Sequence, residues 1–201
     1  PTCSVIGGAA ASYLLRGVHV DAGKRMLKAA VLFAAITVPA QVIVGDLHGL
    51  NVLEHQPTKV AALEGHWESE PEGEGMPFVV FGVPNERAER NDFEIAIPRA
   101  GSIILTHSWD GEIPPLKSVP ASERPPVKPV FYAFRVMVGL GTLMLILTLY
   151  SLYQFWRGRL YESRLALRGW RVLTLAGFVC MLAGWYVTEI GRQPYVIYGL
   201  L

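Results

Sequence analysis

Two charged side chains five positions apart, Lys59 and Glu64, are the first candidates for chemistry. They fall in the segment 56–67, where Pro57 at a first-turn position and the alanines that follow predict a helix. A separation of five residues places the two side chains about 140° apart around that helix, so they do not form a standard helix ion pair. They could instead flank a small polar ligand such as a quinol, whose oxidation needs a group that holds its oxygen and a base that takes its proton. The alternative is a pair of solvated surface charges.

A second group of candidates lies near the C-terminal end of the sequence. Met181, Trp185 and Glu189 are spaced by four residues, which places them on one face of a helix. Arg192 follows three residues later and continues the stripe. An aromatic ring, a carboxylate and an arginine along one face suggest a cofactor that carries anionic groups. The alternative is an interfacial Trp with a Glu–Arg pair at a membrane edge.

The third candidate is a methionine beside an arginine. Arg135 opens a long apolar stretch, and Met137 follows two residues later. A Met in a membrane helix usually serves packing, but its thioether can also be an axial ligand of haem iron opposite a His. Because the histidines all fall in predicted connections, a haem interpretation requires a His from outside this sequence; they are His19, His48, His55, His66 and His107.

The elements that must position these side chains are membrane helices. A spanning helix needs about 20 mainly apolar residues, and the uncharged stretches are 1–15, 29–45, 136–156 and 172–188. The third of these is long enough, flanking charged residues can extend the second and fourth by snorkelling, and the first fits the tail of a longer helix. We therefore expect an all-α, multi-pass transmembrane helix bundle. Since both ends fall in apolar sequence, we also expect the chain to be a fragment that lacks N-terminal helices.

Orientation follows from Lys and Arg residues, which cluster in the two short connections. These connections should be cytoplasmic and the long segment between them periplasmic. The expected order is the end of a truncated helix 1–16, a cytoplasmic connection 17–28, a transmembrane helix 29–46, a periplasmic loop 47–129, a transmembrane helix 130–156, a cytoplasmic connection 157–171, a transmembrane helix 172–190 and a truncated periplasmic end 191–201. Within the loop we expect an acidic turn at 68–75, an extended run or strand at 78–81 and an apolar segment at 95–105.

Composition excludes some classes of function. The chain is 51% hydrophobic with a net charge of +1, and no clustered basic surface stands out, so nucleic acid is not an expected partner. Cys3 and Cys180 both fall in apolar stretches and are expected to be buried small hydrophobes.

Read as strings, the same residues resemble subunit I of cytochrome bd-type quinol oxidases. The motifs occur in the family's order, with GDLHGLN at 45–51 and EHQPTKVAALEGHWE at 54–68 like the start of its quinol-binding loop, FRVMVG at 134–139 like its methionine-ligand helix, and GWYVTEIGRQP at 184–194 like its C-terminal motif. The HGLN and EGHW wording is closest to the cyanide-insensitive branch. The family usually has Trp where Tyr195 stands here.

The resemblance implies a role for each candidate. Lys59 and Glu64 match the residues used for quinol binding and oxidation. Met137 matches the axial ligand of low-spin haem b iron, and Glu189 matches the ligand of high-spin haem b iron. The remaining matches lie around the haems, with Arg135 close to the low-spin haem, Trp185 between haems and Arg192 near haem propionates.

The resemblance also implies a reaction and partners. The family oxidises membrane quinol at the external face and passes electrons through haem b to a site that reduces O2 to water, which generates a proton gradient. Expected cofactors are low-spin and high-spin haem b, with haem d or a haem b in its place at the oxygen site. Expected partners are subunit II, a small accessory subunit, lipid, quinol and O2, in the bacterial inner membrane. The fragment alone is expected to be inactive, and the open alternative is a non-enzymatic multi-pass membrane protein or transporter whose external loop binds a partner.

Overall fold

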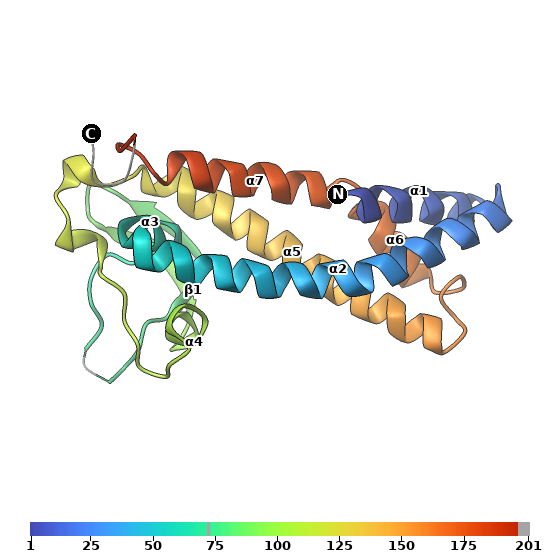
Figure 1. The fold of residues 1–201 in the computed structure, drawn as a ribbon, viewed down its shortest axis with the longest axis horizontal. Helices are drawn as coiled ribbons and strands as arrows, with labels where there is room; N and C mark the ends of the chain where they lie inside the picture. The colour runs from blue at the N-terminus through green and yellow to red at the C-terminus, as the bar shows by residue number, and fades with distance from the viewer. Residues whose placement is uncertain (72, 197–201) are drawn as a thin grey trace. The chain divides into compact units, whose positions relative to one another are not determined.

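The structure is a computed structural model that describes residues 1–71 and 73–196 (Figure 1). The chain divides into two compact units. Unit 1 comprises Pro1–Ile43 and Met137–Leu182, and unit 2 comprises Val44–Val136 and Ala183–Leu201. Most described residues are helical.

Unit 1 consists of helices packed around buried small and aromatic residues. It contains α1 (Thr2–Arg16), the first part of α2 (Val20–His55), most of α5 (Val127–Trp156), α6 (Arg164–Val172) and the start of α7 (Ala176–Ile190). The helix α1 ends at Gly17, whose φ of 69° is a left-handed conformation that glycine adopts without strain. The helix α6 begins at Ser163, whose side chain caps it by accepting a hydrogen bond from the Ala166 N–H.

Trp170 is the centre of the packing in unit 1. Its ring is fully buried, and its indole N–H donates a 2.9 Å hydrogen bond to Ser151 Oγ. The helix α1 approaches it through Gly7, where a Cβ atom would lie 2.3 Å from the Trp170 ring. A residue without a side chain at position 7 therefore lets α1 pack directly on α6.

Two helices are long and apolar enough to cross a membrane, α2 and α5, judged by length and composition among the described residues. The pair formed by α6 and the segment Ala176–Gly191 would add a third, with a bend of 42° between its parts. The helices extend well beyond the apolar stretches that predicted them. Helix α2 continues through Asp46 to His55. The expected connection 157–171 contains a turn at Gly158, whose φ is 69°, and then most of α6.

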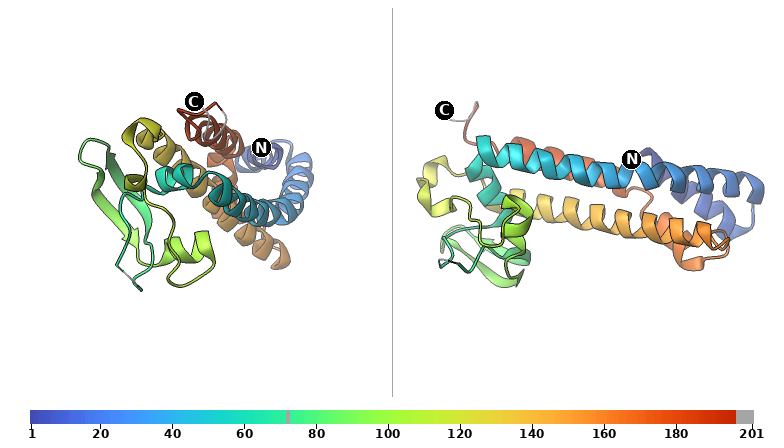
Figure 2. Two further views of the ribbon diagram at one scale, coloured as in Figure 1. Left: turned by 60° about the vertical axis from the view of Figure 1, so that its left-hand side comes forward. Right: turned by 60° about the horizontal axis from the view of Figure 1, so that its bottom comes forward.

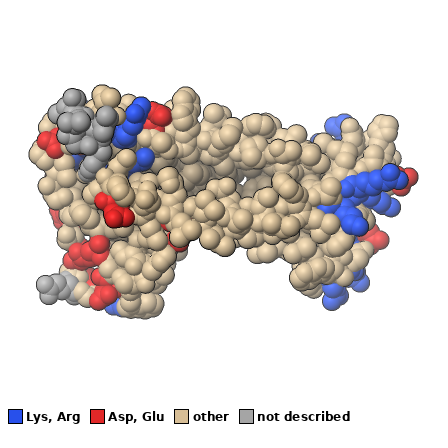
Figure 3. All heavy atoms as spheres, in the orientation of Figure 1, with Lys and Arg blue, Asp and Glu red and all other residues tan. Residues whose placement is uncertain are grey.

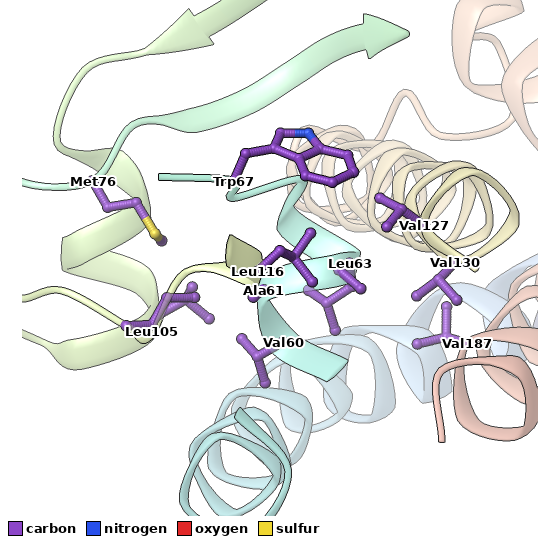
Figure 4. Packing of buried hydrophobic residues seen from close by; sticks show 12 residues of the cluster. Val60, Ala61, Leu63, Trp67, Met76, Leu105, Leu116, Val127, Val130 and Val187 are labelled. Carbon is purple, nitrogen blue, oxygen red and sulfur yellow. The ribbon is translucent and has the colours of Figure 1, made fainter. Parts of the chain in front are cut away.

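Unit 2 surrounds the short helix α3 (Pro57–Glu64). Its other elements are β1 (Phe78–Asn85), β2 (Arg90–Ile97), α4 (Ala100–Thr106), the 3₁₀ turns η1 (Leu116–Ser118) and η2 (Ala121–Glu123), and the adjoining ends of α2, α5 and α7. Figure 4 shows apolar side chains from these elements converging on α3, among them Leu63, Leu116, Val130 and Val187.

The strands correct the all-α expectation. The predicted extended run at 78–81 is the start of β1, which pairs with β2 in an antiparallel hairpin from Phe78 opposite Ile97 to Asn85 opposite Arg90. The left view of Figure 2 shows this hairpin, which is the one sheet among residues 1–71 and 73–196. The apolar segment 95–105 is not one element, since it covers the end of β2 and most of α4. The correct class is therefore mostly helical with one hairpin.

Candidate functional site

The helix α3 holds two of the predicted site residues and owes its bounds to two residue types. Pro57 stands in its first turn, where no backbone N–H is needed. Gly65 ends it in a left-handed conformation with φ of 68°, and a Cβ there would lie 3.1 Å from Asn91 Oδ1 and 3.2 Å from the Phe131 ring. Every residue from Thr58 to Glu64 is buried. The alternative of two solvated surface charges is therefore wrong for both Lys59 and Glu64.

Glu64 is a buried carboxylate that is half-satisfied. Its side chain is 2% exposed, and its Oε2 accepts a 2.8 Å hydrogen bond from Arg135 Nη2. Its Oε1 has no hydrogen-bond partner among the described residues. Burial raises the pKa of Glu64, and the neighbouring Arg135 opposes that rise. The site thus contains an acid that is poised to hold a proton.

Arg135 is fixed from several sides. Its guanidinium donates to the backbone carbonyls of Val79 and Leu63, and it lies over the ring of Phe131 at 4.4 Å from the centroid. With 11% of its side chain exposed, it is a rigid cation whose carboxylate partner is Glu64. The sequence predicted a site role for Arg135 but not this ion pair; the available signal was that a charge at the start of an apolar helix requires a partner.

Lys59 faces a different group of residues. It is 7% exposed, its Nζ donates to the Thr188 carbonyl over 3.5 Å, and a Cβ on Gly191 would lie 3.0 Å from its Cγ. Burial lowers the pKa of Lys59, Glu189 raises it and Arg192 lowers it. The structure therefore brings Lys59 close to the Glu189 region, while Glu64 turns to Arg135, as expected for side chains on different faces of one helix.

Glu189 and Arg192 form an ion pair of 2.6 Å that remains partly open to solvent. They line a cavity of about 540 Å³ together with Arg124 and Tyr195. The Tyr195 hydroxyl donates a 2.9 Å hydrogen bond to Glu123 Oε2. Part of the expected end 191–201 lies outside the described residues, since the description stops at residue 196.

Trp185 and Met137 are placed less tightly. Trp185 on α7 is 60% exposed and touches Tyr186 edge to face. Met137 belongs to unit 1, is partly buried on α5, and its backbone carbonyl lies 3.7 Å from Cys180 Sγ. Both remain candidates for contact with a flat apolar cofactor.

The donor set can be tested against a haem. Among residues 1–71 and 73–196, no three side chains of His, Cys, Asp or Glu gather as a metal site. The porphyrin of a haem supplies four nitrogen ligands to the iron, and the protein supplies one or two axial ligands. Met137 and Glu189 are single donors of the kind that an axial site uses. Trp185 and Arg192, both partly exposed near Glu189, fit the ring and the anionic groups of a haem.

Two further buried atoms were not predicted from the sequence. Gln56 Oε1 and His66 Nε2, like Glu64 Oε1, have no hydrogen-bond partner in the part of the chain that the structure describes. We call these three atoms the open acceptors. Buried polar atoms without partners are rare in folded proteins, and these three lie at the two ends of α3. Neither Gln56 nor His66 carries a sequence signal stronger than its place beside the predicted helix.

Comparison with known proteins identifies the family of the chain. The family described as cytochrome bd terminal oxidase subunit I matches residues 2–201. "Cytochrome bd ubiquinol oxidase subunit 1" of Bacillus subtilis is 31% identical, over 98% of this chain and 43% of that protein. "Cytochrome bd-II ubiquinol oxidase subunit 1" of Escherichia coli is 28% identical, over 94% of this chain and 49% of that protein.

A solved structure is also similar. The bd oxidase from Geobacillus thermodenitrificans matches with a TM-score of 0.79 and 30% identity, over 98% of this chain and 45% of that chain. The chain thus spans a little under half the length of each of these relatives. Because a family match over nearly all residues coincides with the same fold, the chain belongs to the cytochrome bd terminal oxidase subunit I family, an integral component of the bacterial inner membrane.

Proposed function

We propose that this chain is the quinol-oxidising part of a respiratory quinol:oxygen oxidoreductase. The observation that carries the proposal is Glu64, which is buried with one oxygen held by Arg135 and the other among the open acceptors. A free carboxylate oxygen inside an apolar core is suited to accept a proton from a bound hydroxyl. A quinol supplies an apolar ring with hydroxyl donors, which matches this surrounding.

Glu64, Arg135 and Lys59 have distinct tasks in this proposal. Glu64 Oε1 accepts the proton of one quinol hydroxyl, and the raised pKa of Glu64 lets it keep that proton until it is released. Arg135 fixes the carboxylate so that Oε1, not Oε2, is available. Lys59 offers an N–H donor to a quinol oxygen, since its contact with the Thr188 carbonyl is long at 3.5 Å.

Haem is the electron acceptor implied by the family. When bound, it supplies one-electron transfer and the reduction of O2 to water. We assign Met137 to low-spin haem b iron and Glu189 to high-spin haem b iron, with Arg135, Trp185 and Arg192 beside the haems. A third haem, haem d or a haem b in its place, would complete the oxygen site. Support comes from the single thioether and carboxylate donors and from the open Glu189–Arg192 pair.

The proposed topology places the two basic connections, 17–28 and 157–171, in the cytoplasm and the segment 47–129 in the periplasm. Figure 3 supports this, because Lys and Arg side chains gather at the end of unit 1 where α1 meets the start of α2. Asp21 and Glu162 are the acidic residues of unit 1. Subunit II and a small accessory subunit are the proposed protein partners, with lipid around the spanning helices.

The experiment compares variants in the complete oxidase. Glu64→Gln and Lys59→Met keep the shapes of these side chains, and each should lower quinol oxidation at least about tenfold while the reduced haem bands remain. Asp110→Asn, an exposed carboxylate of the same unit, serves as the control. Loss of the haem bands with normal quinol kinetics would contradict the assignment.

Met137 has a separate test. Met137→Leu keeps volume and apolar character but removes the thioether. The spectrum of the low-spin haem b should change, and an unchanged spectrum would remove Met137 from the ligand set.

A further inference from the structure

A polar cavity of about 630 Å³ lies beside the end of α3 in unit 2. Its walls come from Glu64, the segment that follows it, and the hairpin of β1 and β2. Carboxylates dominate these walls; besides Glu64 they are Glu68, Glu70, Glu89 and Glu94. The cavity thus connects the buried end of α3 with an acidic surface.

Two of the open acceptors, Glu64 Oε1 and His66 Nε2, belong to residues that line this cavity. Both residues are more than nine-tenths buried, with Glu64 2% and His66 6% exposed. The His66 ring forms a hydrogen bond with the backbone of Ile113. Because Nε2 is the open atom, that bond falls to Nδ1, and the neutral ring keeps a lone pair on Nε2. Burial lowers the pKa of His66, which keeps the ring neutral before quinol oxidation.

The carboxylates nearer the surface differ in whether a basic side chain pairs with them. Glu89 is held by Arg124 at 2.6 Å, and Glu68 is paired with Lys117. Glu70 is half-buried, and burial, followed by the negative charges of Glu94 and other nearby glutamates, raises its pKa. A carboxyl group at the cavity wall with a raised pKa can receive and release a proton.

Asn91 joins the buried and outer parts of the cavity wall. Its Nδ2 donates to the Gly65 carbonyl at 2.9 Å and to Glu94 Oε2 at 2.8 Å, and its Oδ1 accepts from Trp67 Nε1 at 3.0 Å. Asn91 therefore fixes Glu94 relative to the end of α3. In the described part of the chain the acidic residues do not approach one another closely enough to bind a metal ion together.

We propose that this cavity is the proton exit of the quinol site, with Glu64 and His66 as its two inner acceptors and Glu70 and Glu94 as the groups that pass protons to solvent. The proposal rests on the proposed quinol oxidation. Oxidation of one quinol to quinone breaks two O–H bonds and releases two electrons, which go to haem. One proton forms an O–H bond at Glu64 Oε1, and the other forms an N–H bond at His66 Nε2. Water in the cavity relays both protons outward, which returns both acceptors to their starting state.

The test uses the complete oxidase in lipid vesicles with a quinol substrate and a pH-sensitive dye on the quinol side. The variants are His66→Phe and the double variant Glu70→Gln with Glu94→Gln, and Asp110→Asn is the matched control. Each test variant should slow proton release about threefold to tenfold and raise the solvent deuterium isotope effect. The double variant should also leave the KM for quinol unchanged, because Glu70 and Glu94 do not contact the quinol. Small diffusible buffers such as imidazole should restore the rate of the double variant.

A second readout does not depend on turnover. The infrared carboxyl band of Glu64, identified by its loss in Glu64→Gln, should titrate at a different pH in the His66→Phe variant. Proton release and an isotope effect equal to those of the unaltered oxidase in both test variants would overturn the exit route, while a strong effect of Glu64→Gln would leave quinol oxidation standing. Normal quinol oxidation by Glu64→Gln would instead overturn the proposed function itself.

Discussion

Unit 1 and unit 2 bury their polar groups in different ways. The buried polar side chains of unit 1 are hydroxyls, such as Ser151 and Thr148, and each takes part in a neutral hydrogen bond. Unit 2 buries charged or titratable groups, Lys59, Glu64 and His66, and it contains all three open acceptors. Unit 1 resembles an ordinary packed scaffold, whereas unit 2 retains groups that folding alone does not favour. The difference indicates that unit 2 holds the proposed proton chemistry, while the haem ligand proposed at Met137 lies in unit 1.

Breaking the buried ion pair of unit 2 should give the largest effect. Arg135→Met leaves Glu64 without its cation, which should destabilise the protein by about 3–5 kcal/mol. The double variant Arg135→Met with Glu64→Leu removes both charges and should recover most of that stability, because an apolar pair avoids the cost of desolvation. Thermal unfolding measures both, and quinol oxidation should stay lost in the double variant. If the double variant were no more stable than the single one, the ion pair would not explain the loss.

The packing of α1 on α6 in unit 1 should affect stability alone. Gly7→Ala places a Cβ 2.3 Å from the Trp170 ring, so α1 must shift away from α6. We expect a loss of about 1–3 kcal/mol, the usual cost of overpacking, with normal quinol oxidation per folded enzyme. A selective loss of quinol oxidation in Gly7→Ala would show that the two units do not divide stability and chemistry as described.

A smaller effect concerns pH and separates His66 from Glu64. Because burial lowers the pKa of His66 from 6.5, the unfolded chain binds its proton more readily. His66 therefore contributes stability above pH 6.5 that is lost as the pH falls below that value. Glu64 has the opposite sign, since its raised pKa makes stability fall as the pH rises above 4.5. Unfolding temperatures of wild type and His66→Gln should converge on acidification, and a constant difference between them would contradict the buried neutral ring.

The sequence predicted the parts of the fold that depend on local pattern. The short helix at 57–64, the strand beginning at Phe78 and the long apolar helices follow from proline position, β-branched residues and uncharged length. It also identified Lys59, Glu64 and Arg135 as candidate site residues. The extension of α2 to His55 was not predicted. A charged residue such as Asp46 marks the end of an apolar spanning segment, but the helix itself continues beyond it.

Pairings between distant segments could not be predicted. Glu64 and Arg135 are 71 positions apart, and Asn91 donates a hydrogen bond to the Gly65 carbonyl 26 positions earlier. Helical spacing relates residues within three or four positions, so it identifies faces but not the partner that a face will contact. His66 illustrates this limit, since only its tertiary surroundings make Nε2 an open acceptor.

The smallest expected effect comes from a charge pair that lies at the rim of the cavity in unit 2. Lys117 is paired with Glu68, whose side chain is 70% exposed. Exposed pairs contribute about 0–1 kcal/mol, so Lys117→Met should barely change the unfolding temperature, in contrast to Arg135→Met. Proton release should also remain close to normal, because Glu68 is not one of the proposed relay groups. A large loss of stability here would mean that unit 2 depends on charge pairs in general, and the special status of the buried Glu64–Arg135 pair would then fail.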